Sequence, residues 1–243
     1  MTHVLPSDYS PYFCSMPKRK LQKFAALHTF TNVLQHTHYK NSALHNSIGE
    51  EVNYKGRWSA DFFRNDNPLI LELACGKGEY TIDMAKAMPD KNFIGIDIKG
   101  NRIHTGAKLG MEQQITNAAF IRMEITQLPL FFAANEVSEI WITFPDPHLK
   151  PCKDQQRLTS ERFLNIYKEF LKTDAVIHLK TDDPTLYNFT LNTIQETNAI
   201  LLINDDDIYS KPLHHPFLAI KTYYEKMHLA EGKKIKYVAM KID

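Results

Sequence analysis

From Pro68 to the C-terminus, short runs of apolar and β-branched residues alternate with longer segments whose apolar residues recur at helical spacing. This alternation is typical of βαβ units, in which helices connect parallel strands. The predicted strands cover residues 69–73, 93–97, 119–121, 140–144, 175–179 and 235–242. The pattern therefore predicts an α/β fold with a mainly parallel sheet.

Two helix starts are marked by capping residues. Ser160 precedes a segment whose apolar residues lie on one helical face, and its hydroxyl can cap the first turn. Asp183 is followed by Pro184, the order expected of an N-cap and a proline at the first helical position. We therefore expect helices to begin at these two points.

The first 50 residues lack the strand and helix alternation. We interpret residues 1–50 as an N-terminal extension, disordered over residues 1–17, and residues 51–243 as the folded domain. The extension carries a basic cluster formed by Lys18, Arg19, Lys20 and Lys23. Two interpretations of this cluster stay open: it wraps an RNA backbone, or it is a solvated or localisation-type charge run.

The composition narrows the class of protein without naming a function. The chain has 243 residues, 43% of them apolar, which suits one domain with an extension. Its 29 basic and 28 acidic residues give a net charge of +1, which does not by itself indicate a nucleic-acid partner. No run is apolar enough for a membrane span or a secretory signal. The three cysteines are widely spaced and the histidines lack partner ligands, so we expect a cytoplasmic protein without a metal site.

The segment from Glu72 to Gly78, E-L-A-C-G-K-G, lies between the first predicted strand and a helix. Small residues such as Gly76 and Gly78 let a backbone approach a ligand closely, and open α/β sheets bind ligands outside the carboxyl ends of their strands. Asp97 ends the second predicted strand, nineteen residues after Gly78. A carboxylate there can accept hydrogen bonds from a ribose, as in sites for NAD, FAD or S-adenosylmethionine.

Two details of this turn favour S-adenosylmethionine. The dinucleotide fingerprint is G-x-G-x-x-G, whereas this turn reads A-x-G-x-G, with Ala74 in place of the first glycine. Glu72 stands inside the strand end, just before the turn. The set resembles the first motif of class I methyltransferases, E-x-G-x-G-x-G, and disfavours a nucleotide-dependent oxidoreductase.

Four further motifs follow in order. They are F-P-D-P-x-x-K at residues 144–150, R-L-T-S-x-R-F-L at 157–164, H-x-K-T-D at 178–182 and T-x-[FY]-E at 222–225. The two prolines around Asp146 predict a stiff turn that holds this acid at a strand end. Together the motifs resemble the tRNA (guanine-N7)-methyltransferase family, from about Lys20 to the end of the chain.

This resemblance implies a Rossmann-like class I methyltransferase, with a mainly parallel seven-stranded sheet, helices on both faces and the N-terminal extension. It also implies methyl transfer from S-adenosylmethionine to N7 of a guanine in the variable region of tRNA, forming 7-methylguanosine. The positions that match the family are Glu72, Gly76, Gly78, Asp97 and Glu124 for the cofactor, Asp146 for catalysis, and Lys150, Asp182, Thr222 and Glu225 for the substrate.

The loop after Asp146 departs from the family. His148 stands where tryptophan is common, Leu149 where proline is common, and the basic run after Lys150 is thinned. Among the basic residues we nevertheless expect Lys150, Lys153 and Arg157 to be the best placed for RNA contact, because they lie nearest the motif.

Two other functions are compatible with the fold. The near-neutral charge permits a methyltransferase that acts on a small molecule or a protein, and an RNA-binding scaffold can keep the fold without activity. The four motifs argue against the first, and the intact acids argue against the second. Tyr223 and Tyr224 either stack on a base or belong to the core. The sequence indicates tRNA as the partner, no obligatory protein subunit, and a monomer or a homodimer.

Overall fold

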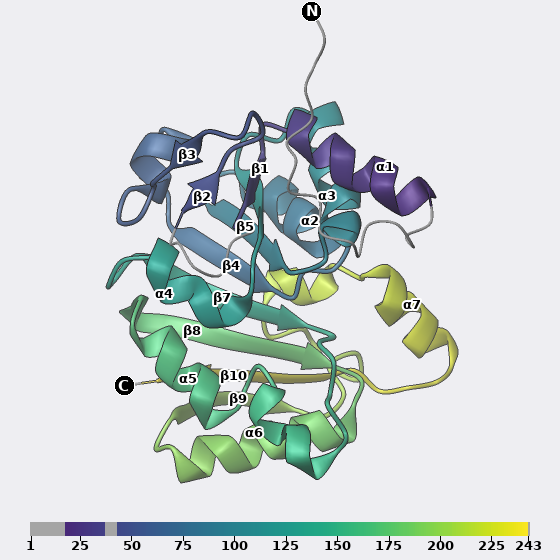
Figure 1. Ribbon diagram of the computed structural model, residues 1–243. Helices are drawn as coiled ribbons and strands as arrows, with labels where there is room; N and C mark the ends of the chain where they lie inside the picture. Colours follow the sequence, from purple (N-terminus) through teal and green to yellow (C-terminus); the bar gives the residue numbers. More distant parts are fainter. Residues whose placement is uncertain (1–17, 37–42, 243) are drawn as a thin grey trace, which may run out of the picture.

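Apolar strands of the central sheet, which are buried on both faces, determine the architecture. The computed structural model describes residues 18–36 and 43–242, and within them one ten-stranded sheet has the order β3-β2-β1-β6-β5-β4-β7-β8-β10-β9 (Figure 1). The strands are β1 (Val33–Gln35), β2 (Leu44–His45), β3 (Glu51–Val52), β4 (Leu69–Leu73), β5 (Asn92–Asp97), β6 (Ala118–Arg122), β7 (Val137–Thr143), β8 (Leu171–Thr181), β9 (Ile200–Asp205) and β10 (Lys236–Lys241).

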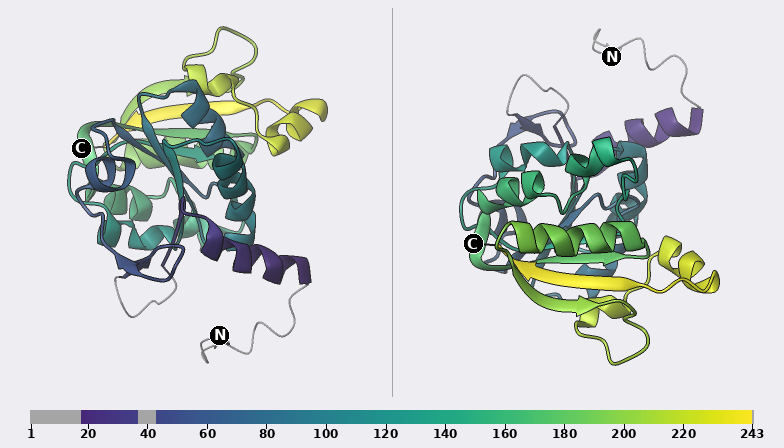
Figure 2. Two further views of the ribbon diagram at one scale, coloured as in Figure 1. Left: turned by 90° about the horizontal axis from the view of Figure 1, so that it is seen from above. Right: turned by 90° about the horizontal axis from the view of Figure 1, so that it is seen from below.

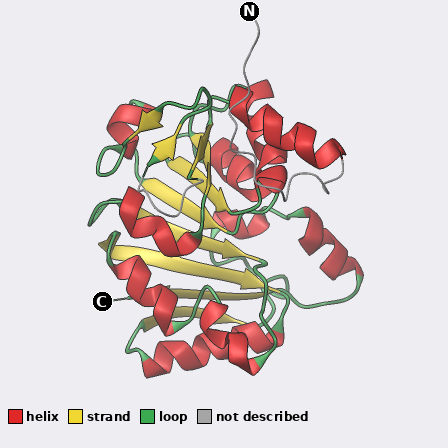
Figure 3. Ribbon diagram, viewed as in Figure 1, coloured by secondary structure: helices red, strands yellow, loops and turns green. Residues whose placement is uncertain are grey.

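Helices cover both faces of this sheet (Figures 2 and 3). One face carries α1 (Lys18–Ala26), α2 (Glu79–Ala87) and α3 (Gly100–Glu112), and the other carries α4 (Leu128–Phe131), α5 (Glu161–Lys168) and α6 (Pro184–Glu196). Each face has its own apolar core. A further helix, α7 (Tyr223–Ala230), stands beyond the carboxyl ends of β7 and β8, at the right of Figure 1.

Short helical segments complete the described chain. They are the 3₁₀ segments Leu27–Thr29, Ile125–Gln127, Pro151–Gln156 and Pro216–Ala219, and one π-helical segment, Trp58–Phe63. The segment Pro151–Gln156 follows the proline-bracketed motif, and Pro216–Ala219 leads into α7.

The α/β fold class is confirmed, whereas the strand number is corrected from seven to ten. The seven strands from β6 to β9 form the expected mainly parallel sheet, in which β10 runs antiparallel to both β8 and β9. Three additional strands come from residues 33–52, and β1 pairs in parallel with β6 through Val33 and Phe120. Part of the region interpreted as an extension therefore continues the sheet. Residues 1–17 lie outside the described residues.

Of the two predicted helix starts, one has the expected cap and the other does not. The Asp183 carboxylate accepts a hydrogen bond from the Leu186 N–H at 2.7 Å, and Pro184 is the first residue of α6, as predicted. The second helix, α5, begins after Ser160, but the hydroxyl of Ser160 makes no cap. It donates to the Gln155 carbonyl at 3.3 Å instead, because the preceding turn brings that acceptor within reach.

Gly78, in the turn after β4, packs closely against Phe120. Replacing it tests how much this close packing contributes to stability. A Cβ at Gly78, whose φ is +70°, would lie 2.3 Å from Cε1 of Phe120, whereas a Cβ at Gly232, with a φ of +73°, would meet nothing within 4 Å. We expect Gly78→Ala to lower the free energy of unfolding by about 2–5 kcal/mol, from backbone strain plus overpacking. The matched control, Gly232→Ala, should lose only the strain, about 1–2 kcal/mol. Urea unfolding of both variants checks this, and equal losses would contradict the packing role.

Candidate active site

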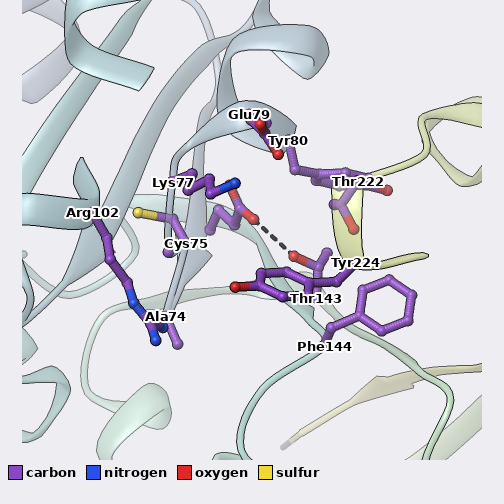
Figure 4. Close-up of a pocket in the computed structure, with 12 residues that line it drawn as sticks. Ala74, Cys75, Lys77, Glu79, Tyr80, Arg102, Thr143, Phe144, Thr222 and Tyr224 are labelled. Carbon is purple, nitrogen blue, oxygen red and sulfur yellow. Dashed lines mark hydrogen bonds between the residues drawn. The ribbon is translucent and has the colours of Figure 1, made fainter. Parts of the chain in front are cut away.

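A cavity of about 80 Å³ opens at the carboxyl ends of the central strands. Its wall combines the end of β4 and the turn after it, the start of α2, the end of β7, the start of α7 and one side chain from α3 (Figure 4). The lining residues are Glu72, Ala74, Cys75, Gly76, Lys77, Glu79, Tyr80, Arg102, Thr143, Phe144, Thr222 and Tyr224. The position agrees with the rule that open α/β sheets bind ligands at this edge.

The turn after β4 takes a left-handed backbone conformation at three alternate residues. The φ angles are +55° at Ala74, +56° at Gly76 and +70° at Gly78. Ala74 thus adopts the conformation for which glycine is the usual residue, so the change from glycine to alanine leaves the turn in place. The Cys75 N–H donates to the Ile96 carbonyl of β5 at 3.0 Å and anchors the turn to the neighbouring strand.

Asp97 ties the ends of β4 and β5 together. Its carboxylate accepts hydrogen bonds from the Gly76 N–H at 3.0 Å and from the Lys99 N–H at 2.7 Å. The backbone carbonyl of Asp97 accepts from the Met123 N–H at 3.2 Å, which brings the segment with Glu124 alongside. Glu124 is half-buried at the start of the 3₁₀ segment after β6. The structure therefore gathers Gly76, Asp97 and Glu124 at neighbouring strand ends.

Glu72 is a buried carboxylate in the cavity wall. It accepts hydrogen bonds from the Thr81 hydroxyl and, at 2.8 Å, from the Thr143 hydroxyl, drawn as the dashed line in Figure 4. Burial raises the pKa of Glu72 from 4.5 to about 7, although both hydroxyls oppose the shift. An acid this deeply buried favours a cation beside it. The sulfonium and ammonium groups of S-adenosylmethionine are cations, so the donor set fits that cofactor.

Asp146 lies in a strained turn after β7. Phe144 and His148, on either side of the Pro145–Pro147 segment, have φ angles of +48° and +44°. The Asp146 carboxylate accepts a hydrogen bond from the His148 N–H at 3.0 Å, and 74% of its side chain is exposed. The predicted stiff turn is present, and it presents the acid to solvent. Lys150 is also exposed, just before the next 3₁₀ segment.

Asp182 links the end of β8 to α7. Its carboxylate lies 3.5 Å from Nδ1 of His228 and 3.4 Å from Nζ of Lys233. Lys236 donates to the Asp182 backbone carbonyl at 3.2 Å. A half-buried acid in contact with these groups holds α7 close to the strand ends.

Thr222 and Glu225 form a capping box at the start of α7. The Thr222 hydroxyl accepts from the Glu225 N–H at 3.1 Å, and the Glu225 carboxylate accepts from the Thr222 N–H at 3.3 Å. Thr222 lines the cavity, whereas Glu225 is fully buried against Nζ of Lys180 at 2.8 Å. The Tyr209 hydroxyl donates to the same carboxylate at 2.6 Å. Glu225 therefore positions α7 in this structure.

Comparisons with known proteins agree with this geometry. A family model described as "Putative methyltransferase" matches residues 66–238. A tRNA (guanine-N(7)-)-methyltransferase of Christiangramia forsetii is 45% identical over 227 residues, covering 93% of this chain and 98% of the relative. The protein of that name from Bacteroides thetaiotaomicron is 43% identical, covering 93% and 87%. This chain belongs to the tRNA (guanine-N7)-methyltransferase family.

Solved structures with little sequence identity support the fold of this family member. The 16S rRNA methyltransferase KamB aligns with a TM-score of 0.60 and 11% identity, covering 80% of this chain and 96% of that one. A 16S rRNA (adenine(1408)-N(1))-methyltransferase from Catenulisporales acidiphilia, solved with its cosubstrate SAM, aligns with a TM-score of 0.55 and 11% identity, covering 80% and 94%. The predictions of the family and of the class I methyltransferase fold are confirmed.

Two residues of this methyltransferase, Lys77 and Arg102, line the cavity although the sequence analysis gave them no role. Lys77 stands between the two glycines of the turn, and its Nζ lies 4.5 Å from the ring centroid of Tyr223. Arg102 reaches the cavity from α3, and Tyr224 reaches it from α7. Tyr223 and Tyr224 are 54% and 50% exposed, so the interpretation that they belong to the core is wrong. For Lys77 its position between two glycines was a sequence signal, whereas Arg102 had none.

Arg157 was expected among the residues best placed for RNA contact, and its burial contradicts this expectation. Its side chain is only 6% exposed, because its guanidinium donates to backbone carbonyls and packs against an aromatic ring. Lys153, by contrast, is exposed.

Within residues 18–36 and 43–242, no helix is long and apolar enough to cross a membrane. In the same part of the chain, no three His, Cys, Asp or Glu side chains come together as a group that could hold a metal ion.

The raised pKa of Glu72 predicts a pH dependence of stability without cofactor. Because the folded pKa of about 7 exceeds the unfolded value of 4.5, the folded state holds this proton more tightly. The resulting stabilisation is complete below about pH 4.5 and is lost as the pH rises through about 7, a change of about 3 kcal/mol. Glu72→Gln keeps the size of the side chain but cannot titrate. We therefore expect the difference in unfolding free energy, native protein minus Glu72→Gln, to fall between pH 5 and 8 when it is measured by urea titration. A difference that stays constant with pH would refute this role of Glu72.

Proposed function

We propose that this protein transfers a methyl group from S-adenosylmethionine to N7 of a guanine in the variable region of tRNA, forming 7-methylguanosine. One observation carries the proposal: the turn after β4, the strained turn with Asp146 and the start of α7 meet at one edge of the sheet. The chain also shares 45% identity with a relative named for this reaction.

The site residues divide into three proposed groups. The cofactor group lies on the ends of β4, β5 and β6, and the substrate group lies on the loop after β7, the end of β8 and α7. The proposed assignments are Glu72, Gly76, Gly78, Asp97 and Glu124 for the cofactor, Asp146 for catalysis, and Lys150, Asp182 and Thr222 for the substrate. Glu225 is fully buried, so we assign it a role on the substrate side through the position of α7.

The chemistry needs little proton transfer. Guanine N7 has an in-plane lone pair and no hydrogen, so the protein need not supply a general base. When bound, S-adenosylmethionine supplies a methyl group on a positively charged sulfonium. The principal task of the chain is to hold the base in line with that methyl group, within about 3–3.5 Å.

We assign the catalytic role to Asp146. Positive charge develops on the guanine as the methyl group arrives, and a nearby carboxylate stabilises that charge. The Asp146 carboxylate receives a hydrogen bond from the His148 N–H, which fixes its direction while most of its surface stays available. Asp182 already contacts His228 and Lys233, so its role is to position the guanine edge and α7.

The rim of the site offers groups that suit RNA. Lys77, Lys150 and Lys153 supply positive charge for phosphates, and the exposed rings of Tyr223 and Tyr224 can stack on an unpaired base. The guanine must leave its stack to reach the site, as bases do in other enzymes that modify them. A tRNA substrate places the proposed activity in the cytoplasm, and the protein acts as a monomer or a homodimer.

Replacing Asp146 tests this function. We expect Asp146→Ala to lower kcat by about 100-fold or more, because one electrostatic contact in the transition state is lost. Purified protein is incubated with labelled S-adenosylmethionine and tRNA lacking 7-methylguanosine, and the labelled nucleoside is identified after digestion. Cofactor binding, followed by calorimetry, should persist in the variant. Asp174→Ala, on an acid with a 93% exposed side chain on β8, is the matched control.

The outcomes separate the alternatives. Label in another nucleoside, or in a protein, would replace the proposed substrate. Cofactor binding by the native protein without transfer to any tRNA would favour the inactive scaffold. Native turnover in Asp146→Ala would remove Asp146 from catalysis while leaving the reaction intact.

A further inference from the structure

The turn that carries Asp146 contains two residues in an unfavourable backbone conformation, so other contacts must stabilise it. Phe144 and His148 both have positive φ angles, in a region that costs a residue with a Cβ about 1–2 kcal/mol. The strand end secures the first of them, because the Phe144 N–H donates to the Lys180 carbonyl of β8 at 2.8 Å. The second, His148, lies four residues further on, where the sheet no longer provides partners.

Arg157 donates hydrogen bonds to this part of the turn. Its Nε donates to the Pro147 carbonyl at 2.9 Å, and its Nη2 donates to the His148 carbonyl at 3.1 Å. Two consecutive carbonyls of the turn are thus bound by one planar, permanently charged group. Since Pro147 follows Asp146 directly, these bonds fix the chain on the C-terminal side of the acid.

The Arg157 guanidinium is itself held in place from the opposite side. Its central carbon lies 4.4 Å from the ring centroid of Phe189, a residue of α6. The side chain is 6% exposed, so it is not free to reach a tRNA phosphate in this conformation. A buried guanidinium that donates two hydrogen bonds to the turn and packs against an aromatic ring is suited to hold the backbone in place.

We propose that Arg157 is a positioning residue for methyl transfer, which holds the Pro147–His148 carbonyls and thereby sets the direction of the Asp146 carboxylate. The link is direct, because the His148 N–H that donates to Asp146 belongs to the residue whose carbonyl Arg157 binds. The inference rests on the proposed role of Asp146. It assigns Arg157 no contact with the tRNA or the cofactor.

The test compares Arg157→Met and Arg157→Lys with the native full-length chain. Methionine keeps an apolar stem and loses both hydrogen bonds, and lysine keeps the charge but cannot bind both carbonyls with a rigid fork. Arg162→Met is the matched control, since Arg162 is an exposed arginine on α5 near a phenylalanine ring. Steady-state kinetics with tRNA lacking 7-methylguanosine are measured together with cofactor affinity by calorimetry and the melting temperature.

We expect Arg157→Met to lower kcat on the order of 10- to 100-fold, the effect of a displaced catalytic group. Arg157→Lys should retain an intermediate rate, Arg162→Met the native rate, and cofactor affinity should stay within about twofold in all three. A native kcat in Arg157→Met overturns the proposal. So does a rate loss in both Arg157 variants that only parallels lost cofactor binding and a collapsed melting temperature, because Arg157 is then a general folding element.

A second variant tests the clamp itself. Asparagine adopts positive φ more readily than histidine, so His148→Asn should need the clamp less. The factor by which Arg157→Met lowers kcat should therefore be smaller in the His148→Asn background, and an equal factor in both backgrounds would exclude action through His148. An inactive native protein would instead refute the proposed function, so the two failures are distinguishable.

Discussion

The buried ammonium of Lys180 is the interaction on which the arrangement of the site depends. Its Nζ donates to the carbonyls of Leu218 and Ile220 at 3.1 and 2.9 Å and pairs with Glu225, while its backbone carbonyl holds Phe144. One residue of β8 therefore fixes both α7 and the start of the turn with Asp146. Burial lowers the pKa of Lys180 to about 8, against the opposing charge of Glu225. Desolvation offsets much of the attraction in a pair this deeply buried, so its clear effect here is on the position of α7 and the turn.

A second buried ionisable residue, Glu72, lies on the cofactor side of the site, and its partners differ from those of Lys180. Lys180 has a charged partner within the chain, whereas Glu72 receives hydrogen bonds from uncharged groups, the Thr81 and Thr143 hydroxyls and the Thr81 backbone. We therefore expect a cation bound in the cavity to stabilise the ionised carboxylate of Glu72. The two halves of the site thus differ in kind: the substrate half is organised by a pair internal to the chain, and the cofactor half is prepared for a charge from outside.

The elements with strong local patterns could be predicted from the sequence, and those that depend on tertiary contacts could not. β4 to β8 and the cap at Asp183 follow from apolar runs and capping residues. β9 was not found individually, because Ile200, Leu201 and Leu202 are 43–46% exposed at a sheet edge and show no alternation. The motifs pointed to Glu72, Asp97, Asp146 and Thr222, which lie at one edge of the sheet, and their roles stay predictions. The burial of Arg157 and Glu225 could not be inferred from the sequence. Charged residues are mostly exposed, and the sequence does not show which polar groups will surround them in the folded protein.

The sheet order explains why both strained turns lie where they do. β4 lies between β5 and β7, so the chain leaves it toward β5 on one side and returns later on the other, and a crevice opens at such a switch point. The turns that bound this crevice contain the non-glycine residues Ala74, Phe144 and His148 at positive φ. The Cys75 N–H, next to Ala74, donates to the Ile96 carbonyl of β5, and the Phe144 N–H donates to the Lys180 carbonyl of β8. Only His148 lies beyond the reach of a strand, which is why a side chain from outside the sheet, Arg157, is needed to bind its carbonyl.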